Sequence, residues 1–228
     1  MEKIELIKQT RGNTKREVYN SLRTNLLFTG VENRVLLITS CFPGEGKSTV
    51  SFDLAISYAE SGKNVLWIDA DMRRSTFMEK CQSKKPLEGL SHYLSGQSLE
   101  EEVIYATNYE KLYVIPAGFL PRNPSDLLVH ERMTELMQHV RAEFDFIVID
   151  TPPLGSVIDA AVAAKYADAT MMVVANNTVL RQTGKSIMEK LKQANPNFLG
   201  VVLNKVEVNK NGYGKYYSKY YGNYYGQK

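Results

Sequence analysis

The chain has 228 residues, of which 43% are hydrophobic and 23% charged, as in ordinary soluble globular proteins. This length suits one well-buried α/β domain. Four lysines after Val208 give the C-terminal segment a charge of +4, so with a formal net charge of +3 the remaining residues sum to −1. The composition therefore excludes a basic nucleic-acid-binding face on the body of the protein, and we expect no nucleic acid partner.

The two cysteines, Cys41 and Cys81, lack a CxxC spacing and predict neither a disulfide framework nor a zinc site. The N-terminus lacks the apolar core of a signal peptide, and no apolar run approaches the ~20 residues that cross a bilayer. We therefore expect a protein of the reducing cytoplasm, which would need a partner to hold it at a membrane.

The predicted elements alternate along the chain. Helical patterns cover 14–28, 47–61, 124–142, 157–167 and 180–194, with short helical pieces in 75–104. Apolar runs rich in β-branched residues cover 34–40, 64–71, 111–118, 144–153, 169–176 and 199–206. Such runs are typical of parallel strands covered on both faces. The sequence therefore predicts an α/β fold, a doubly wound, mainly parallel sheet flanked by helices. The predicted domain spans 1–208, followed by a flexible tail over 209–228.

A phosphate-binding loop is predicted at "ITSCFPGEGKST", between a strand and a helix. Gly44 and Gly46 would let backbone N–H groups turn toward phosphate oxygens at the helix N-terminus. Lys47 would reach the β- and γ-phosphates, and the Ser48 hydroxyl would bind Mg²⁺. Cys41, directly after Ser40, stands at the first glycine of the GxxxxGK[ST] pattern. A glycine turn beside an incidental lysine is the alternative, but the flanking strand and helix favour a nucleotide site.

Acidic side chains end two of the predicted strands. In "VLWIDADMRR", Asp69 and Asp71 are two residues apart, which in an extended segment places both on one face. Such a pair suits two tasks beside Mg·ATP: orienting the metal and taking a proton from a hydroxyl. In "FIVIDTPP", Asp150 stands where phosphate-loop proteins carry a Mg²⁺-orienting acid.

Other polar residues leave two interpretations open. Arg73 and Arg74 would stabilise phosphate charge or bind a partner. Asp159 would line the site or simply start a helix. Asn204, at the end of the last strand, would read the nucleotide base or form a turn.

The last sixteen residues, "YGKYYSKYYGNYYGQK", hold seven of the fourteen tyrosines and no aliphatic residue. This composition predicts a flexible tail. One hypothesis makes its tyrosines phosphate acceptors. Another makes the tail a module that stacks on sugars or nucleobases or lies at a membrane interface, beside an ATPase switch. A third is an inactive nucleotide-binding paralogue, against which the intact lysine and acids argue.

The motifs "SCFPGEGKST", "VLWIDADMR" and "FIVIDTPP" resemble Walker A, A′ and B of the bacterial tyrosine kinases of capsular and exopolysaccharide biosynthesis. The tail resembles their autophosphorylation cluster, and "REVYNSLRTNLLF" resembles their N-terminal helix. "IPAGFLPRNPSDLL" is similar to their AGxxPPNPxELL segment, with Arg122 at the second proline. Related partition and septum-placement ATPases carry a signature lysine directly after the first loop position, where this chain has Phe42, which favours the kinases.

The resemblance implies an ATP- and Mg²⁺-dependent protein tyrosine autokinase and a role for each motif residue. The implied catalytic residues are Lys47, Asp69, Asp71 and Asp150. Nucleotide binding falls to Gly44, Glu45, Gly46, Lys47, Ser48, Thr49 and Asn204. Metal binding falls to Ser48, Asp69 and Asp150. The phosphoacceptors, on neighbouring subunits, would be Tyr213, Tyr216, Tyr217, Tyr220, Tyr221, Tyr224 and Tyr225.

The resemblance also implies partners. Family members form homo-oligomeric rings through an ExxRxxR motif in the N-terminal helix; here Glu17 and Arg23 match, and Asn20 replaces the middle arginine. The chain resembles the stand-alone cytoplasmic type, which a transmembrane adaptor recruits to the membrane and activates, and a phosphotyrosine phosphatase reverses. Exogenous protein substrates are also expected, as is regulation of polysaccharide synthesis and export.

Overall fold

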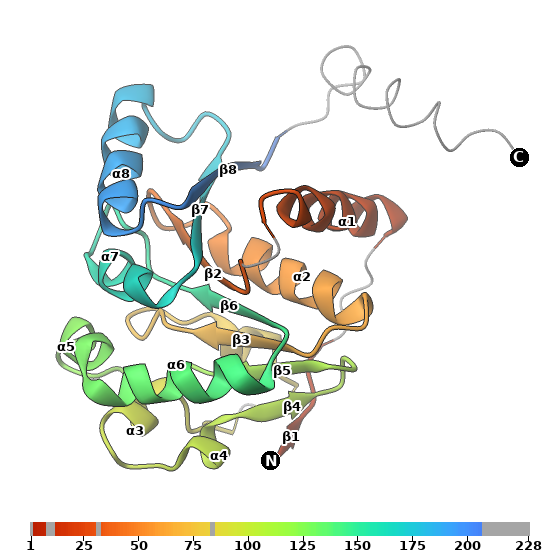
Figure 1. Ribbon diagram of the computed structural model, residues 1–228, viewed down its shortest axis with the longest axis vertical. Coiled ribbons are helices and arrows are strands. Elements are labelled where there is room, and N and C mark those ends of the chain that lie inside the picture. Colours follow the sequence, from red (N-terminus) through yellow and green to blue (C-terminus); the bar gives the residue numbers. More distant parts are fainter. Residues whose placement is uncertain (1, 8–11, 31–32, 83–84, 207–228) are drawn as a thin grey trace, which may run out of the picture.

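The chain folds around one sheet between two layers of helices (Figure 1). The computed structural model describes residues 2–7, 12–30, 33–82 and 85–206. Within them, the 8-stranded sheet has the order β1-β4-β5-β3-β6-β2-β7-β8. All neighbouring strands are parallel except β4 and β5. The predicted α/β class with a mainly parallel sheet is confirmed.

The three strands that lead to the predicted site are buried along their whole length. The strands are β1 (Lys3–Ile4), β2 (Val35–Ser40), β3 (Val65–Asp69), β4 (Tyr105–Thr107), β5 (Leu112–Ile115), β6 (Phe146–Asp150), β7 (Ala169–Ala175) and β8 (Phe198–Asn204). Every residue of β2, β3 and β6 is buried, as expected of parallel strands covered on both faces. The sequence patterns miss β1 and β4 because two or three residues are too few to show a period.

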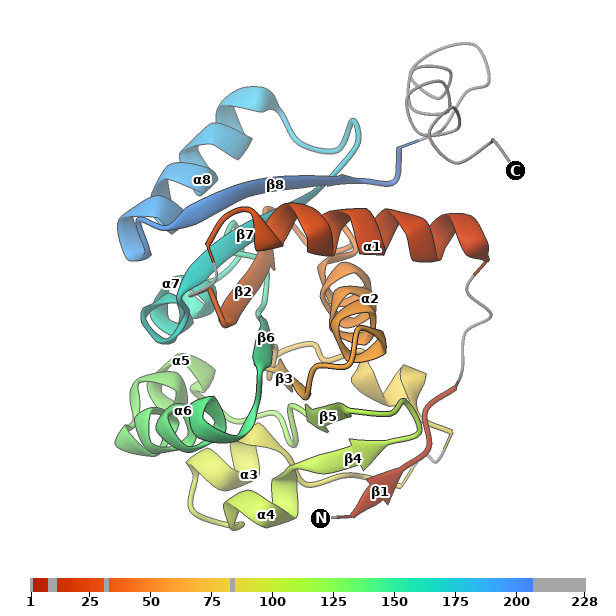
Figure 2. The same ribbon diagram turned by 45° about the vertical axis from the view of Figure 1, so that its right-hand side comes forward.

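Helices cover both faces of the sheet (Figure 2). One face packs against α1 (Asn13–Leu27), α2 (Lys47–Glu60) and the 3₁₀ turn η1 (Phe77–Lys80). The other face packs against α3 (Leu90–Leu94), α4 (Glu100–Val103), α5 (Pro124–Val129), α6 (Glu131–Glu143), α7 (Asp159–Ala163), η2 (Ala164–Tyr166) and α8 (Arg181–Ala194). None of the helices in the described part of the chain is long and apolar enough to cross a membrane.

Two predicted helices are wrong in their extent. The segment predicted as one helix over 124–142 forms α5 and α6, because His130 between them is extended at φ −61° and ψ 148°. The His130 side chain accepts a hydrogen bond from the Arg132 N–H and so caps α6. The segment predicted over 157–167 forms the short helix α7 followed by η2.

The helices α1 and α2 meet along a polar seam, which we call the α1–α2 seam. Lys15 Nζ lies 2.8 Å from Asp53 Oδ2, and Arg16 Nε lies 3.1 Å from Glu60 Oε2. The Ser57 hydroxyl donates to Asn20 Oδ1 at 2.9 Å, and Arg23 donates to the Ser57 carbonyl. α2 is buried along almost its whole length, so its polar residues Asp53 and Ser57 need these partners from α1.

The predicted ring-contact residues lie on α1. Glu17 is exposed, whereas Arg23 is partly buried and contacts Ser57 of its own chain. Asn20, at the position of the motif's middle arginine, also contacts Ser57. The seam therefore uses part of this motif within one subunit, and a ring contact stays a prediction.

Candidate nucleotide site

The loop between β2 and α2 has the backbone that a phosphate cradle needs. Gly44 and Gly46 have φ values of 83° and 90°, in the left-handed region that favours glycine. A Cβ at Gly46 would collide with the amide group of Asn204. Gly46 is the N-cap of α2, and no side chain caps the helix there. The N-terminus of α2 thus offers its N–H groups and positive dipole end to an anion.

Side chains from neighbouring strands hold this loop in place. The Glu45 carboxylate is buried; it accepts from the Phe42 N–H at 2.7 Å and from the Ala175 N–H at 3.2 Å. Asn204 Nδ2 donates to the Glu45 carbonyl at 2.9 Å. Sequence reasoning placed both residues in nucleotide binding. Their side chains brace the loop from the ends of β7 and β8, and contact with a nucleotide stays a prediction for them, as it does for Thr49.

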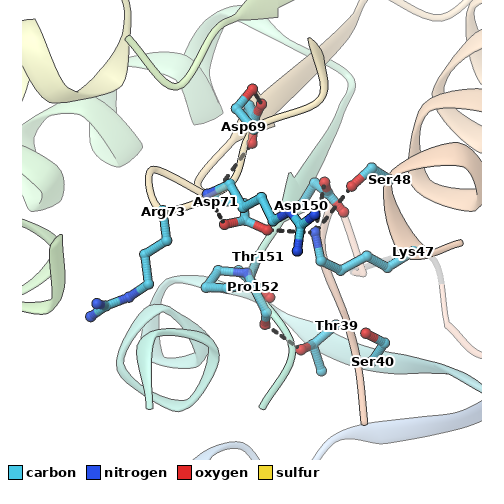
Figure 3. A network of polar contacts seen from close by, with 12 residues as sticks. Thr39, Ser40, Lys47, Ser48, Asp69, Asp71, Arg73, Asp150, Thr151 and Pro152 are labelled. Atoms are coloured by element: carbon cyan, nitrogen blue, oxygen red, sulfur yellow. Dashed lines mark hydrogen bonds and ion pairs between the residues drawn. The ribbon is translucent and has the colours of Figure 1, made fainter. Parts of the chain in front are cut away.

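Lys47 lies at the centre of the site, between two carboxylates (Figure 3). Its Nζ is 2.8 Å from Asp71 Oδ2 and 3.6 Å from Asp150 Oδ2, and it donates to Ser48 Oγ at 3.0 Å. Burial alone would lower the pKa of Lys47, but Asp150 and Asp71 outweigh it and the pKa is raised. The Lys47 side chain is therefore protonated and positively charged where the phosphate-binding loop meets α2.

Asp69 orders the turn that carries Asp71. Its Oδ1 accepts from the Asp71 N–H at 3.1 Å, and its Oδ2 accepts from the Ser75 hydroxyl at 2.5 Å. β3 ends at Asp69, two residues before the predicted run ends, and the Asx-type bond from the Asp71 N–H to Asp69 orders the turn in which Asp71 reaches Lys47. Burial and the nearby Asp150 raise the pKa of Asp69 to about 7, against the opposing effects of Ser75 and Lys47.

Asp150 ends β6, directly beside Asp69 in the β3–β6 register. Burial raises the pKa of Asp150, and Lys47 partly offsets this. Its Oδ1 is buried and has no hydrogen-bond partner in the described part of the chain. One ammonium group, that of Lys47, thus faces three buried carboxylates, and an unmatched carboxylate oxygen points at the need for a further cation.

The donor set fits Mg²⁺. Within the described residues, no three His, Cys, Asp or Glu side chains are arranged to hold a metal alone. Mg²⁺ at phosphate sites is typically held by one or two carboxylates, with water and phosphate oxygens completing the shell. Asp150 and Asp69, with the Ser48 hydroxyl at the start of α2, are the residues that would hold it.

An ion pair lies beside the acidic turn. Arg73 Nε is 2.8 Å from Asp159 Oδ2, and Arg73 Nη2 is 3.0 Å from Asp159 Oδ1. The Ser125 hydroxyl donates to Asp159 Oδ1 at 2.6 Å. In Figure 3 the Arg73 side chain points away from Lys47. Asp159 is the first residue of α7, so it both starts a helix and binds Arg73, a partner 86 residues away that sequence reasoning did not find.

The loop after β6 runs beside the strand that leads into the phosphate loop. Thr39 Oγ1 donates to the Pro152 carbonyl at 2.8 Å, and the Leu154 N–H donates to the Ser40 carbonyl at 2.9 Å. Cys41 is fully buried next to this contact. Burial, aided by Glu45, raises the pKa of its thiol to about 11, so Cys41 is a neutral packing residue.

The glycine loop, the helix N-terminus and the lysine among carboxylates define a phosphate-loop nucleotide-binding protein. Comparison with known proteins agrees. The sequence model of the AAA domain family matches residues 33–200. Tyrosine-protein kinase CpsD of Streptococcus agalactiae is 40% identical over 88% of this chain and 87% of its own length. Tyrosine-protein kinase YwqD of Bacillus subtilis is 34% identical over 88% and 85%.

A solved structure gives the same result in three dimensions. The kinase domain of the Escherichia coli tyrosine kinase ETK superposes with a TM-score of 0.78 at 35% identity, covering 84% of this chain and 76% of that one. The chain therefore belongs to the bacterial tyrosine-protein kinase family, and the predicted family and enzyme class are confirmed. The predicted phosphoacceptor tyrosines, all in 213–225, lie outside the described residues.

Proposed function

We propose that this protein is an ATP- and Mg²⁺-dependent tyrosine autokinase that phosphorylates the C-terminal tyrosine cluster of neighbouring subunits. The observation that carries the proposal is the position of Lys47, at the N-terminus of α2 and 2.8 Å from Asp71 and 3.6 Å from Asp150. A loop that binds phosphate without such acids would serve binding alone. An acid pair beside the phosphate-binding cation can accept a proton from a hydroxyl group or from water, and the similarity to tyrosine-protein kinases supports the hydroxyl group of tyrosine as the acceptor.

The residues of the chain divide the work as follows. The N–H groups after Gly44 and at the start of α2 would hold the ATP phosphates, and Lys47 would move from Asp71 to the transferring phosphoryl group. Bound Mg²⁺ supplies neutralisation of phosphate charge. Asp71, once released by Lys47, or its neighbour Asp69 would accept the phenolic proton of the incoming tyrosine. The γ-phosphoryl group would pass to the phenolic oxygen as its bond to the β–γ bridging oxygen of ATP breaks, and ADP would leave.

The tail is a suitable substrate by its composition. Its closely spaced tyrosines would present one hydroxyl after another to the same site. Each phosphate adds nearly two negative charges at neutral pH, so a few transfers would reverse the +4 charge of this segment. Modification would thereby change which surfaces the tail binds, which is a direct way to regulate polysaccharide synthesis and export.

Family membership supports a proposal about partners. We propose a cytoplasmic protein recruited to the membrane by a transmembrane adaptor that activates it, reversed by a phosphotyrosine phosphatase, and acting also on other protein substrates. Assembly would be a homo-oligomeric ring with Glu17 and Arg23 of α1 at the contact. The proposed domain is 1–208, with 209–228 as the acceptor tail.

Mass spectrometry of the tail after incubation with Mg·ATP tests the proposal. The protein is incubated alone and with the cytoplasmic peptide of a candidate adaptor, and Lys47→Met serves as the control. Phosphate on several of the seven tail tyrosines, absent from the control, is the expected result. ATP hydrolysis with an unmodified tail would contradict it and would favour an ATPase switch whose tail binds another molecule.

A second variant tests the tail itself. Replacement of all seven tail tyrosines by phenylalanine is expected to remove most self-labelling while ATP affinity is kept. Labelling that persists at Tyr19 or Tyr58 would show that the acceptors are elsewhere. Both of these tyrosines are buried in the folded chain, which argues against their use as acceptors.

A further inference from the structure

We propose that Asp159 is a positioning residue for phosphoryl transfer, acting through Arg73 on the turn that carries Asp71, with Ser125 completing the contact. The inference rests on the proposed function, because it assigns a further residue to the same site. Asp159 lies on α7 and touches neither Lys47 nor the phosphate loop in the described structure. Its effect on the reaction must therefore pass through its partner.

The contact is built for rigidity. Asp159 is fully buried, and both of its oxygens bind the Arg73 guanidinium, at 2.8 and 3.0 Å. The Ser125 hydroxyl donates to Asp159 at 2.6 Å and accepts from Arg73 Nη2 at 3.2 Å, so the three side chains form a closed hydrogen-bond network. Bidentate arginine–carboxylate pairs fix orientation as well as distance. Arg73 is thus held in one geometry although its side chain is 37% exposed.

The network joins three segments that surround the site. Arg73 belongs to the turn after β3, Ser125 to the first turn of α5, and Asp159 to the start of α7 after the loop that follows β6. The strands β3 and β6 are neighbours, with Asp69 beside Asp150. The ion pair therefore ties the two loops together beyond the strand ends, two residues after Asp71 in one loop and nine residues after Asp150 in the other.

Besides this tie, three contacts hold the acidic turn: the Ala70 N–H donates to the Asp150 carbonyl at 2.8 Å, the Met72 side chain is buried, and Asp71 binds Lys47. Asp69 receives the Asp71 N–H and the Ser75 hydroxyl, and Asp71 Oδ1 receives the Arg74 N–H at 3.0 Å. These bonds shape the turn internally but do not set its distance from Lys47. A shift of about 1 Å in a catalytic group can cost on the order of 100-fold in rate. The Arg73–Asp159 pair adds a rigid, charged restraint that fixes the turn against α5 and α7.

The alternative use of Arg73 is direct contact with the acceptor. Its side chain is partly exposed and its positive charge lies near Asp71, since Asp159 first and Asp71 in part raise the pKa of Arg73. In that case Asp159 would only pack a surface arginine. The two interpretations predict different kinetics, because loss of an acceptor contact raises the acceptor KM whereas loss of positioning lowers kcat.

Asp159→Asn is the principal test, since it keeps the shape of the side chain and removes the charge. We expect kcat for tail phosphorylation to fall about 10-fold with the KM for ATP and for an acceptor peptide within twofold of the unaltered protein. Glu60→Gln, which removes the same type of contact with Arg16 in the α1–α2 seam, is the matched control and should leave kcat unchanged.

A binding measurement gives a readout that needs no turnover. Fluorescent ADP should bind Asp159→Asn with unchanged affinity in EDTA, because the phosphate loop is intact. The gain in affinity on adding Mg²⁺ should be several-fold smaller than in the unaltered protein, because the acids that face the metal are no longer held. Ser125→Ala deletes one hydroxyl of the network. This variant should show a smaller fall in kcat and a smaller loss of the Mg²⁺-dependent increase in ADP affinity, and it provides the test if Asp159→Asn does not fold.

Three outcomes would overturn the inference. Asp159 would be a structural residue only if Asp159→Asn lowered the melting temperature but left both kcat and the Mg²⁺-dependent increase in ADP affinity unchanged. A raised acceptor KM with unchanged kcat in Arg73→Gln and Asp159→Asn would assign Arg73 to the acceptor. Equal effects in Glu60→Gln would show a general loss of stability. An unaltered protein that hydrolyses ATP without labelling tyrosine would refute the proposed function alone. The positioning role would then still be tested by the effect of Asp159→Asn on the hydrolysis rate and on the Mg²⁺-dependent increase in ADP affinity.

Discussion

Two charged regions of this molecule lie along α2, one at its N-terminal end and one from its middle to its C-terminal end, and they are organised differently. At the N-terminal end, one ammonium group, that of Lys47, faces the carboxylates of Asp69, Asp71 and Asp150. Along the α1–α2 seam, each charge has one partner of opposite sign: Lys15 binds Asp53, and Arg16 binds Glu60. The first region carries excess negative charge in a buried place, whereas the second is balanced.

The difference separates a working site from a structural contact. A balanced pair of opposite charges needs no further ion to stabilise it, and removing one member of such a pair leaves an unmatched charge. An unbalanced cluster is strained by itself and is relieved when a cation binds. The raised pKa values of Asp69 and Asp150 and the unmatched Oδ1 of Asp150 are the marks of that strain. Functional sites are where such strain persists in folded proteins.

The largest effect is expected at Lys47, the cation between Asp71 and Asp150 in the unbalanced cluster. Lys47→Met removes the charge that stabilises the transferring phosphoryl group, so kcat for tail phosphorylation should fall at least about 100-fold. Single-turnover assays with radiolabelled ATP measure it. Phosphotyrosine formation by this variant, in a preparation free of other tyrosine kinases, would show that the cation acts elsewhere.

Asp69→Asn should separate stability from activity. Loss of a metal-facing carboxylate should lower kcat about 100-fold. Removal of one of three buried like charges should raise the free energy of unfolding of the nucleotide-free protein, by about 1 kcal/mol. Urea denaturation and kinetics on the same preparation measure both. A variant that loses stability together with activity would make Asp69 a structural acid, held for its bonds to Ser75 and the Asp71 N–H.

The sequence was sufficient to predict most of the fold and the first contacts of the site. The apolar runs that become β2, β3 and β6 predict buried strands, and the residues that follow them predict where Lys47 and Asp150 meet. The break at His130 and the short strands β1 and β4 leave no periodic signal. Local patterns are read over a few residues, and these features are decided by tertiary packing.

Contacts between distant segments are the part that a single sequence could not give. Arg73 and Asp159 are 86 residues apart, and nothing in "DMRRST" or "VIDAAV" pairs them. The same holds for Asn20 and Ser57, 37 residues apart on α1 and α2. A motif identifies the type of residue at a position. Only the folded chain shows which neighbour that residue uses.

Asp53→Asn should act in the opposite sense to Asp69→Asn. Asp53 is buried and binds Lys15 across the seam, so the loss of its charge should lower the free energy of unfolding by about 1 to 3 kcal/mol, while kcat stays within about twofold. Glu60→Gln, at the more exposed pair with Arg16, should cost less than about 1 kcal/mol. An unchanged stability in Asp53→Asn would mean that α1 is not held on α2 by charge.

The smallest effect is expected from the neutral contact in the same seam. Ser57→Ala removes the hydroxyl that donates to Asn20 at 2.9 Å, and the net value of such a bond is about 1 kcal/mol. Asn20→Ala should cost a similar amount, and the double variant no more than either single one, because both delete the same bond. Additive losses, measured by urea denaturation, would show that the two residues stabilise the protein independently. They would also leave Arg23, which binds the Ser57 carbonyl, as the main polar contact between this part of α1 and the helix that begins at the nucleotide site.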